Sequence, residues 1–169
     1  MDAEALRREA LRRSYRPRRV RLLLVGESPP AGGTFFYHEE KNLLSTSTAC
    51  AFKGAYGIEF EDNASFLRFF QSRGCYLEDL SLKPVNTMRP RERERELQAS
   101  VPSLSRRIRR LGPVVVVAIL RRIERYVKEA LAMTDCPAVF RVLPFPVWRR
   151  NTYIDGLSDL LRRYLPRKA

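Results

Sequence analysis

The sequence predicts an α/β fold, a three-layer α/β/α sandwich with a central four-stranded parallel sheet. Short apolar runs alternate along the chain with segments of helical pattern, an order typical of parallel sheets that carry helices on both faces. The runs are continuous, as in Val20–Val25 and Val114–Leu120, so we expect strands that are buried on both sides. The length of 169 residues fits a single domain, with a basic N-terminal helix within residues 1–18 and a core over 19–166.

Each half of the chain is expected to supply two strands. The elements predicted for the first half are a helix over 3–13, a strand over 20–25, a long loop over 27–60 with at most one helical turn, a helix from Asp62 or Asn63 to Gly74, and a strand over 75–82. Those predicted for the second half are a helix over 91–111 that is interrupted at Pro102 and restarts with Ser103 as its cap, a strand over 114–119, a helix over 121–132, a strand over 139–143 and a closing helix over 152–164.

The charge composition indicates a polyanionic partner. The chain has 32 Lys and Arg against 19 Asp and Glu, a net charge of +13, and 27 of the basic residues are arginine. Guanidinium groups bind phosphate bidentately, which lysine does not do. Nucleic acid is therefore the leading class of partner. The alternative is a general preference for arginine in the source organism.

Composition also argues against several other classes of protein. The longest apolar run has seven residues, whereas a helix needs about 20 to cross a bilayer, and the N-terminus lacks the apolar stretch of a secretory signal. Three widely spaced cysteines, one histidine and no CxxC pair do not predict disulfides, zinc or an iron–sulfur cluster. We expect a cytoplasmic monomer with no cofactor, no metal and no contact with membranes.

In open parallel sheets, ligands bind beyond the carboxyl ends of the strands. Those ends are predicted at residues 26–30, 83–89, 120–122 and 144–151. Three of these four segments are polar and rich in proline, and they are expected to converge on one cleft.

The segment after the first strand places a carboxylate, Glu27, on a loop stiffened by two prolines. The aromatic triplet Phe35, Phe36 and Tyr37 follows and offers a surface on which a base can stack. The alternative is a plain turn with these aromatic residues in the core.

The segment after the second predicted strand is polar, and the one after the fourth combines aromatic residues with arginines. Alternation puts Asp79, Ser81 and Lys83 on one strand face, which indicates either a polar cleft or an edge strand with a wet face. The Arg/Glu alternation over 91–96 predicts a solvated helix face with internal ion pairs. Residues 143–151 combine two aromatic residues with two arginines on a proline-stiffened loop, which suits insertion into a nucleic acid. The alternative is a rigid connector whose tryptophan packs on the last helix.

Taken in order, these segments resemble the uracil-DNA glycosylase superfamily over residues 20–165. Gly-Glu-Ser-Pro-Pro at 26–30 is similar to its first motif, Gly-[Gln/Glu/Ile/Met]-[Asp/Ala/Asn/Ser]-Pro-[Tyr/Gly], and is nearest to the Gly-Glu-Ala-Pro-Gly branch. Leu-Pro-Phe-Pro at 143–146 lies where the second motif, His-Pro-Ser-Pro, is expected. Leu143 thus replaces the histidine that stabilises the departing base anion, and Ser28 replaces the water-positioning Asp or Asn of other branches. The four cluster-binding cysteines of the thermophilic branch are absent.

The resemblance implies a DNA glycosylase that hydrolyses the N-glycosidic bond of a flipped-out uracil or other damaged base in double- or single-stranded DNA. The implied catalytic residues are Glu27 first, then Asp79, with Ser28 beside them; the implied base-binding residues are Phe35, Phe36, Tyr37 and Asn86; the implied DNA-binding residues are Arg89, Phe145, Trp148, Arg149, Arg150 and Asn151. One alternative is a non-catalytic nucleic-acid-binding protein of the same fold. A hydrolase with Ser28 as nucleophile is disfavoured because the segment is not a Gly-x-Ser-x-Gly elbow.

Overall fold

A computed structural model describes residues 3–167, and these residues form a four-stranded parallel sheet in the order β2-β1-β3-β4. The strands are β1 (Leu22–Gly26), β2 (Cys75–Asp79), β3 (Val115–Ala118) and β4 (Val139–Val142). The helices are α1 (Ala3–Ser14), α2 (Leu43–Tyr56), α3 (Asn63–Ser72), α4 (Pro90–Leu111), the 3-10 turn η1 (Arg121–Ile123), α5 (Glu124–Ala132) and α6 (Pro146–Tyr164). The predicted sandwich around four parallel strands is confirmed.

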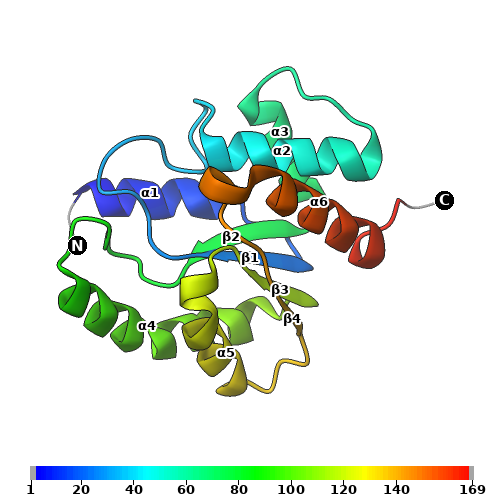
Figure 1. Ribbon diagram of the computed structural model, residues 1–169. Coiled ribbons are helices and arrows are strands. Elements are labelled where there is room, and N and C mark those ends of the chain that lie inside the picture. Colours follow the sequence, from blue (N-terminus) through cyan, green and yellow to red (C-terminus); the bar gives the residue numbers. More distant parts are fainter. Residues whose placement is uncertain (1–2, 168–169) are drawn as a thin grey trace.

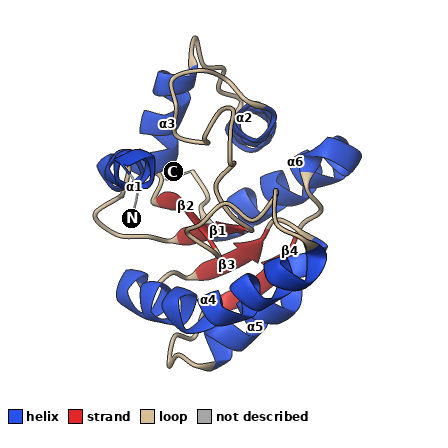
Figure 2. Ribbon diagram, turned by 90° about the vertical axis from the view of Figure 1, so that its left-hand side faces the viewer, coloured by secondary structure: helices blue, strands red, loops and turns tan. Residues whose placement is uncertain are grey.

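Two helical layers enclose the sheet. Helices α4 and α5 lie on one face, and α1, α2, α3 and α6 lie on the other (Figures 1 and 2). Strands β1 and β3 form the centre, and every residue of both is buried. This burial on both faces explains why their sequences are continuous apolar runs. Among the described residues, no helix is long and apolar enough to cross a membrane.

The strands are closely aligned, so their carboxyl ends meet at one edge. Leu22 of β1 pairs with Cys75 on one side and Val115 on the other, and Val115 pairs with Val139. The loops that follow the four strands therefore begin side by side, as parallel topology requires. The candidate functional site lies at this edge.

The long loop predicted between the first strand and residue 60 is wrong, because α2 forms within it. Asn42 caps α2 by accepting a hydrogen bond from the Ser45 amide at 2.9 Å. The helix then packs closely on α6, where a Cβ on Gly54 would lie 2.7 Å from Ser158 Oγ. That hydroxyl donates to the Ala51 carbonyl at 2.8 Å. Small and hydroxylated residues thus make this a helix–helix contact, although the same composition is typical of loops.

Two helix boundaries also differ from the prediction. Helix α4 runs through Pro102 without a break, since Leu97, Val101, Leu104 and Ile108 form a buried stripe and the exposed proline leaves one carbonyl open to solvent. Helix α6 starts at Pro146, earlier than expected, and non-helical backbone angles at Arg149 set its first turn apart from the rest.

The edge strand β2 is closed by side chains rather than by a further strand. Tyr37 Oη accepts from the Leu77 amide at 2.7 Å and donates to the Leu77 carbonyl at 3.0 Å. Arg107 donates to the carbonyls of Asp79 and Leu80 at 2.7 and 3.0 Å, and Arg12 donates to Leu77 at 3.1 Å. These bonds satisfy backbone groups that an exposed edge would leave to solvent or to another chain. Of the two alternatives that the sequence left open, a polar cleft or an edge strand with a wet face, the wet face is not observed, because every residue of the edge strand β2 is buried.

Candidate functional site

The carboxyl edge of the sheet opens into a cleft of about 360 Å³. This volume lies within the range of roughly 300–1,000 Å³ that is typical of small-molecule sites. The loops that follow all four strands contribute to its lining. The cleft brings together eight of the residues predicted from the sequence, namely Glu27, Ser28, Phe35, Phe36, Asp79, Asn86, Phe145 and Trp148.

Hydrogen bonds hold the first two of these loops together. Backbone pairing continues past the strands, where Leu80 N–H donates to the Gly26 carbonyl at 2.8 Å. Ser28 Oγ accepts from the Val85 amide at 3.2 Å, and Asn86 Oδ1 accepts from the Ala31 amide, also at 3.2 Å. Ser28 therefore links the two loops, and the Asn86 carboxamide presents its NH₂ group as the remaining donor.

Glu27 is held by two arginines that sequence reasoning did not assign to the site. Arg93 of α4 donates to both carboxylate oxygens through Nε (3.1 Å) and Nη2, and Arg122 of η1 donates to Oε2 at 2.8 Å. The Glu27 side chain is 8% exposed, whereas those of Arg93 and Arg122 are 24% and 51% exposed. We call these three residues the cleft cluster. Both guanidinium groups lie where a ligand can reach them, and one carboxylate faces two positive charges.

Asp79 is the second carboxylate of the cleft, and its surroundings differ from those of Glu27. Arg12 donates to Asp79 Oδ2 at 2.7 Å, while Oδ1 lies against Gly26, where an added Cβ would come within 2.7 Å of it. Burial raises the pKa of Asp79 above its ordinary value, and the charge of Arg12 offsets only part of that increase. Buried carboxylates with raised pKa values are typical of catalytic sites.

Asp79 also belongs to a buried group of charges. Arg107 donates to Glu78 Oε2 at 2.6 Å, and Arg12 Nη1 lies 3.6 Å from the same oxygen. We call Arg12, Glu78, Asp79 and Arg107 the edge cluster. The side chains of all four are between 1% and 9% exposed, so each charge depends on its partners rather than on water.

The aromatic triplet divides between the cleft and the core. Phe35 and Phe36 line the cleft, but both rings are buried and pack against neighbouring rings, Phe36 on Phe70 at 5.5 Å between centroids. Tyr37 does not line the cleft and closes the edge of β2 as described above. Phe35 and Phe36 thus form an apolar floor for the cleft, and neither ring is free to stack on a base from both sides.

The mouth of the cleft carries the most exposed aromatic residue described. Trp148 is 75% exposed and lies in the first turn of α6, before the kink at Arg149. Phe145 lines the cleft beside it. Arg149, Asn151 and, on the loop after β2, Arg89 are exposed but do not line the cleft. Arg150 contacts α2, where its Nε donates to Ser47 Oγ at 3.1 Å.

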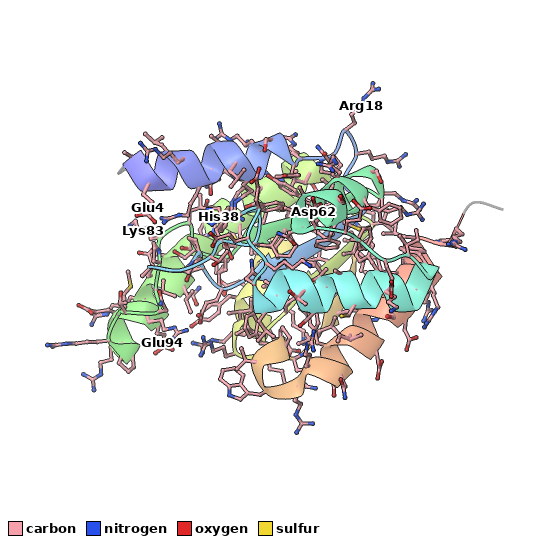
Figure 3. All side chains as sticks on the ribbon, turned by 90° about the horizontal axis from the view of Figure 1, so that it is seen from above. Glu4, Arg18, His38, Asp62, Lys83 and Glu94 are labelled. Atoms are coloured by element: carbon pink, nitrogen blue, oxygen red, sulfur yellow. The ribbon has the colours of Figure 1, made fainter. Side chains whose placement is uncertain are left out.

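The positions of His38 and Leu143 bear on two of the mechanisms considered above. His38 is the histidine that a hydrolase with Ser28 as nucleophile would need, and Leu143 replaces the histidine of the second glycosylase motif. His38 lies outside the cleft, on the loop before α2 (Figure 3), and its Nδ1 accepts from the Phe35 amide at 3.2 Å. It is therefore not brought to Ser28. Leu143 is buried against α6, where a Cβ on Gly156 would lie 2.6 Å from its Cδ2. Within residues 3–167, no group of three or more His, Cys, Asp or Glu side chains is placed to hold a metal ion.

Sequence reasoning missed the two arginines for different reasons. Arg122 lies in the segment that follows β3, and this position at the carboxyl end of a strand was a signal for a ligand-binding residue. That segment lacks the prolines of the segments that follow the other three strands. Arg93 belongs to the Arg/Glu alternation that predicted a solvated helix face, and nothing in that pattern separates it from Arg91 or Arg95.

Comparison with protein-family models and with curated proteins finds no match to this chain.

Proposed function

We propose that this protein is a DNA glycosylase, which hydrolyses the bond between a flipped-out base and its sugar. The observation that carries the proposal is one cleft that combines an apolar aromatic floor, a buried carboxylate with a raised pKa and exposed guanidinium groups. An extruded base needs an apolar pocket with a few polar groups. The resemblance of the two motifs that flank this cleft to those of the uracil-DNA glycosylases adds to the argument.

In this proposal Asp79, rather than Glu27, orients the attacking water. Both Glu27 oxygens accept from Arg93, and one of them also accepts from Arg122. In Asp79, which lines the cleft, Arg12 holds Oδ2, so in this proposal Oδ1 accepts the hydrogen bond from water. Ionised Asp79 also favours the positive charge that develops on the sugar as the base departs.

Several of the other predicted residues bind the substrate in this proposal. Phe35 and Phe36 provide the apolar wall, and the Asn86 NH₂ group donates to an oxygen of the base. Trp148 and Phe145 occupy the space that the flipped nucleotide leaves in the duplex. Arg149 and Arg150, at the start of α6, bind phosphates of the flanking strand.

The test is excision from oligonucleotides that carry uracil, hypoxanthine, xanthine or modified pyrimidines, in duplex and single-stranded form, followed by alkaline cleavage. We expect a strand break at one or more of these lesions. Asp79→Asn should lower the single-turnover rate by about 100-fold or more, the range of general base catalysis. Because Asp79 must be ionised, the wild-type rate should fall as the pH drops through a pKa above that of an ordinary aspartate.

Glu78→Gln is the matched control, because Glu78 belongs to the same edge cluster but does not line the cleft. Folded Glu78→Gln protein should keep its excision rate. If the two variants lose activity equally per folded molecule, Asp79 has a structural role only.

The second candidate function is nucleic-acid binding without catalysis. It is favoured by the ion pairs that hold both carboxylates of the cleft. Tight binding of lesion-containing DNA with no strand break at any lesion would support this function instead.

A further inference from the structure

A departing base needs a partner for its negative charge, and the position that the motif suggests does not supply one. The resemblance places a histidine where this chain has Leu143. That side chain is buried against Gly156 of α6 and does not line the cleft. Any group that stabilises the base anion must therefore come from another part of the cleft.

The cleft cluster contains two guanidinium groups, and they differ in how much of their hydrogen-bonding capacity is used. Arg93 binds Glu27 with both Nε and Nη2. Arg122 binds Glu27 through Nη2 only, and its side chain is 51% exposed. Arginine has five N–H donors, so Arg122 retains donors for a ligand while one end is held.

Apolar residues flank Arg122 at the edge of the cleft. Ile119 and Leu120 precede it at the end of β3 and line the same cleft as the buried Phe36. Two guanidinium groups against one carboxylate leave the cleft cluster with a net positive charge.

We infer that Arg122 is a catalytic residue that stabilises the negative charge on the departing base, and that Glu27 is the positioning residue that holds it. The substrate class is then bases that leave as anions, such as uracil, hypoxanthine and xanthine. This inference rests on the proposed glycosylase function.

The reaction balances with water as the only co-reactant. The bond from the sugar C1′ to the base nitrogen breaks, and its electron pair stays on the base, where Arg122 donates hydrogen bonds to it. The oxygen of water bonds to C1′. The proton released by that water passes to Asp79 and then, through solvent, to the base. The products are the free base and an abasic sugar with a hydroxyl group at C1′.

The test compares single-turnover excision of uracil and 5-fluorouracil from otherwise identical duplexes at saturating protein. Fluorine withdraws electrons, so 5-fluorouracil leaves more readily and depends less on Arg122. We expect Arg122→Gln to slow excision of uracil by about 100-fold, as for loss of a donor to a developing anion, and excision of 5-fluorouracil by much less. The ratio of the 5-fluorouracil rate to the uracil rate should therefore rise relative to the wild type.

Arg121→Gln is the matched control, since Arg121 is exposed, lies one residue away and does not line the cleft. It should leave both rates and their ratio unchanged. An unchanged ratio in Arg122→Gln, with equal slowing of both bases or only weaker binding, would mean that Arg122 binds phosphate and would overturn the inference. If the wild type excises no base, the glycosylase proposal fails and this inference fails with it.

Glu27→Gln tests the positioning role. A glutamine keeps one acceptor oxygen but loses the charge that holds the two guanidinium groups. The rate ratio should shift in the same direction as in Arg122→Gln, by a smaller factor. A normal ratio in Glu27→Gln, with a raised ratio in Arg122→Gln, would show that Arg122 acts without Glu27.

Discussion

The edge cluster and the cleft cluster are built from the same chemical groups but are exposed to solvent very differently. In the edge cluster, two arginines and two carboxylates are almost completely buried, and the arginines also bind backbone carbonyls of β2. In the cleft cluster, a buried Glu27 holds two arginines that reach solvent. The comparison teaches that burial, rather than residue type, distinguishes arginines that hold the fold from arginines that can bind a ligand.

The largest effect is expected from removing an arginine of the edge cluster. Arg107→Ala leaves Glu78 without its closest cation and two carbonyls without donors. Loss of one partner from a buried ion pair lowers the free energy of unfolding by about 3–5 kcal/mol. Urea denaturation measures this change. Arg106→Ala, at the exposed neighbouring position of α4, should change it by less than about 0.5 kcal/mol.

If Arg107→Ala and Arg106→Ala are equally stable, the edge of β2 is held by Tyr37 and Arg12 without Arg107. The edge cluster would then not differ from the cleft cluster in its contribution to the stability of the fold.

A sharper form of the comparison makes the same substitution in each cluster. Glu78→Gln leaves the buried Arg107 without its carboxylate partner, while Arg12 keeps Asp79, so we expect a loss of about 3 kcal/mol in the free energy of unfolding. Glu27→Gln leaves two arginines that water can solvate, so we expect a loss of about 1 kcal/mol or less. Parallel urea titrations measure both. Equal losses would show that exposure of the arginines does not separate the clusters.

The strands and most helices were predictable because their residues carry local signals. Continuous apolar runs marked β1 and β3, and Asp62 marked the start of α3 as its N-cap. Helix α2 was missed because its stability comes from packing on α6 through Gly54 and Ser158, and such tertiary interactions override local propensity.

The candidate site shows the same division between local and tertiary information. Parallel topology predicted that Glu27, Asp79 and Phe145 converge, and they do. The arginine that pairs with each carboxylate was not predictable. Arg12 and Arg93 come from helices that are distant in sequence, and the sequence pattern does not distinguish one arginine-rich helix from another. The buried position of Tyr37 likewise depends on a strand edge that forms only in the folded sheet.

The smallest expected effect concerns the cleft mouth and tests whether nucleic acid meets this side of the molecule. Arg149→Ala combined with Arg150→Ala should weaken DNA binding at every sequence. The slope of the logarithm of the DNA association constant against the logarithm of the salt concentration should become less steep by about 0.9 for each phosphate that the variant no longer neutralises. We expect a small change in the slope because Arg150 already forms a hydrogen bond with Ser47 of α2.

The matched control is Arg162→Ala combined with Arg163→Ala, which removes the same charge from the opposite end of α6 (Figure 1). It should leave the salt dependence closer to that of the wild type, because these arginines lie away from the cleft mouth. If the control reduces the slope as much as the test variant does, DNA is attracted by overall charge and the mouth of the cleft has no special part in binding.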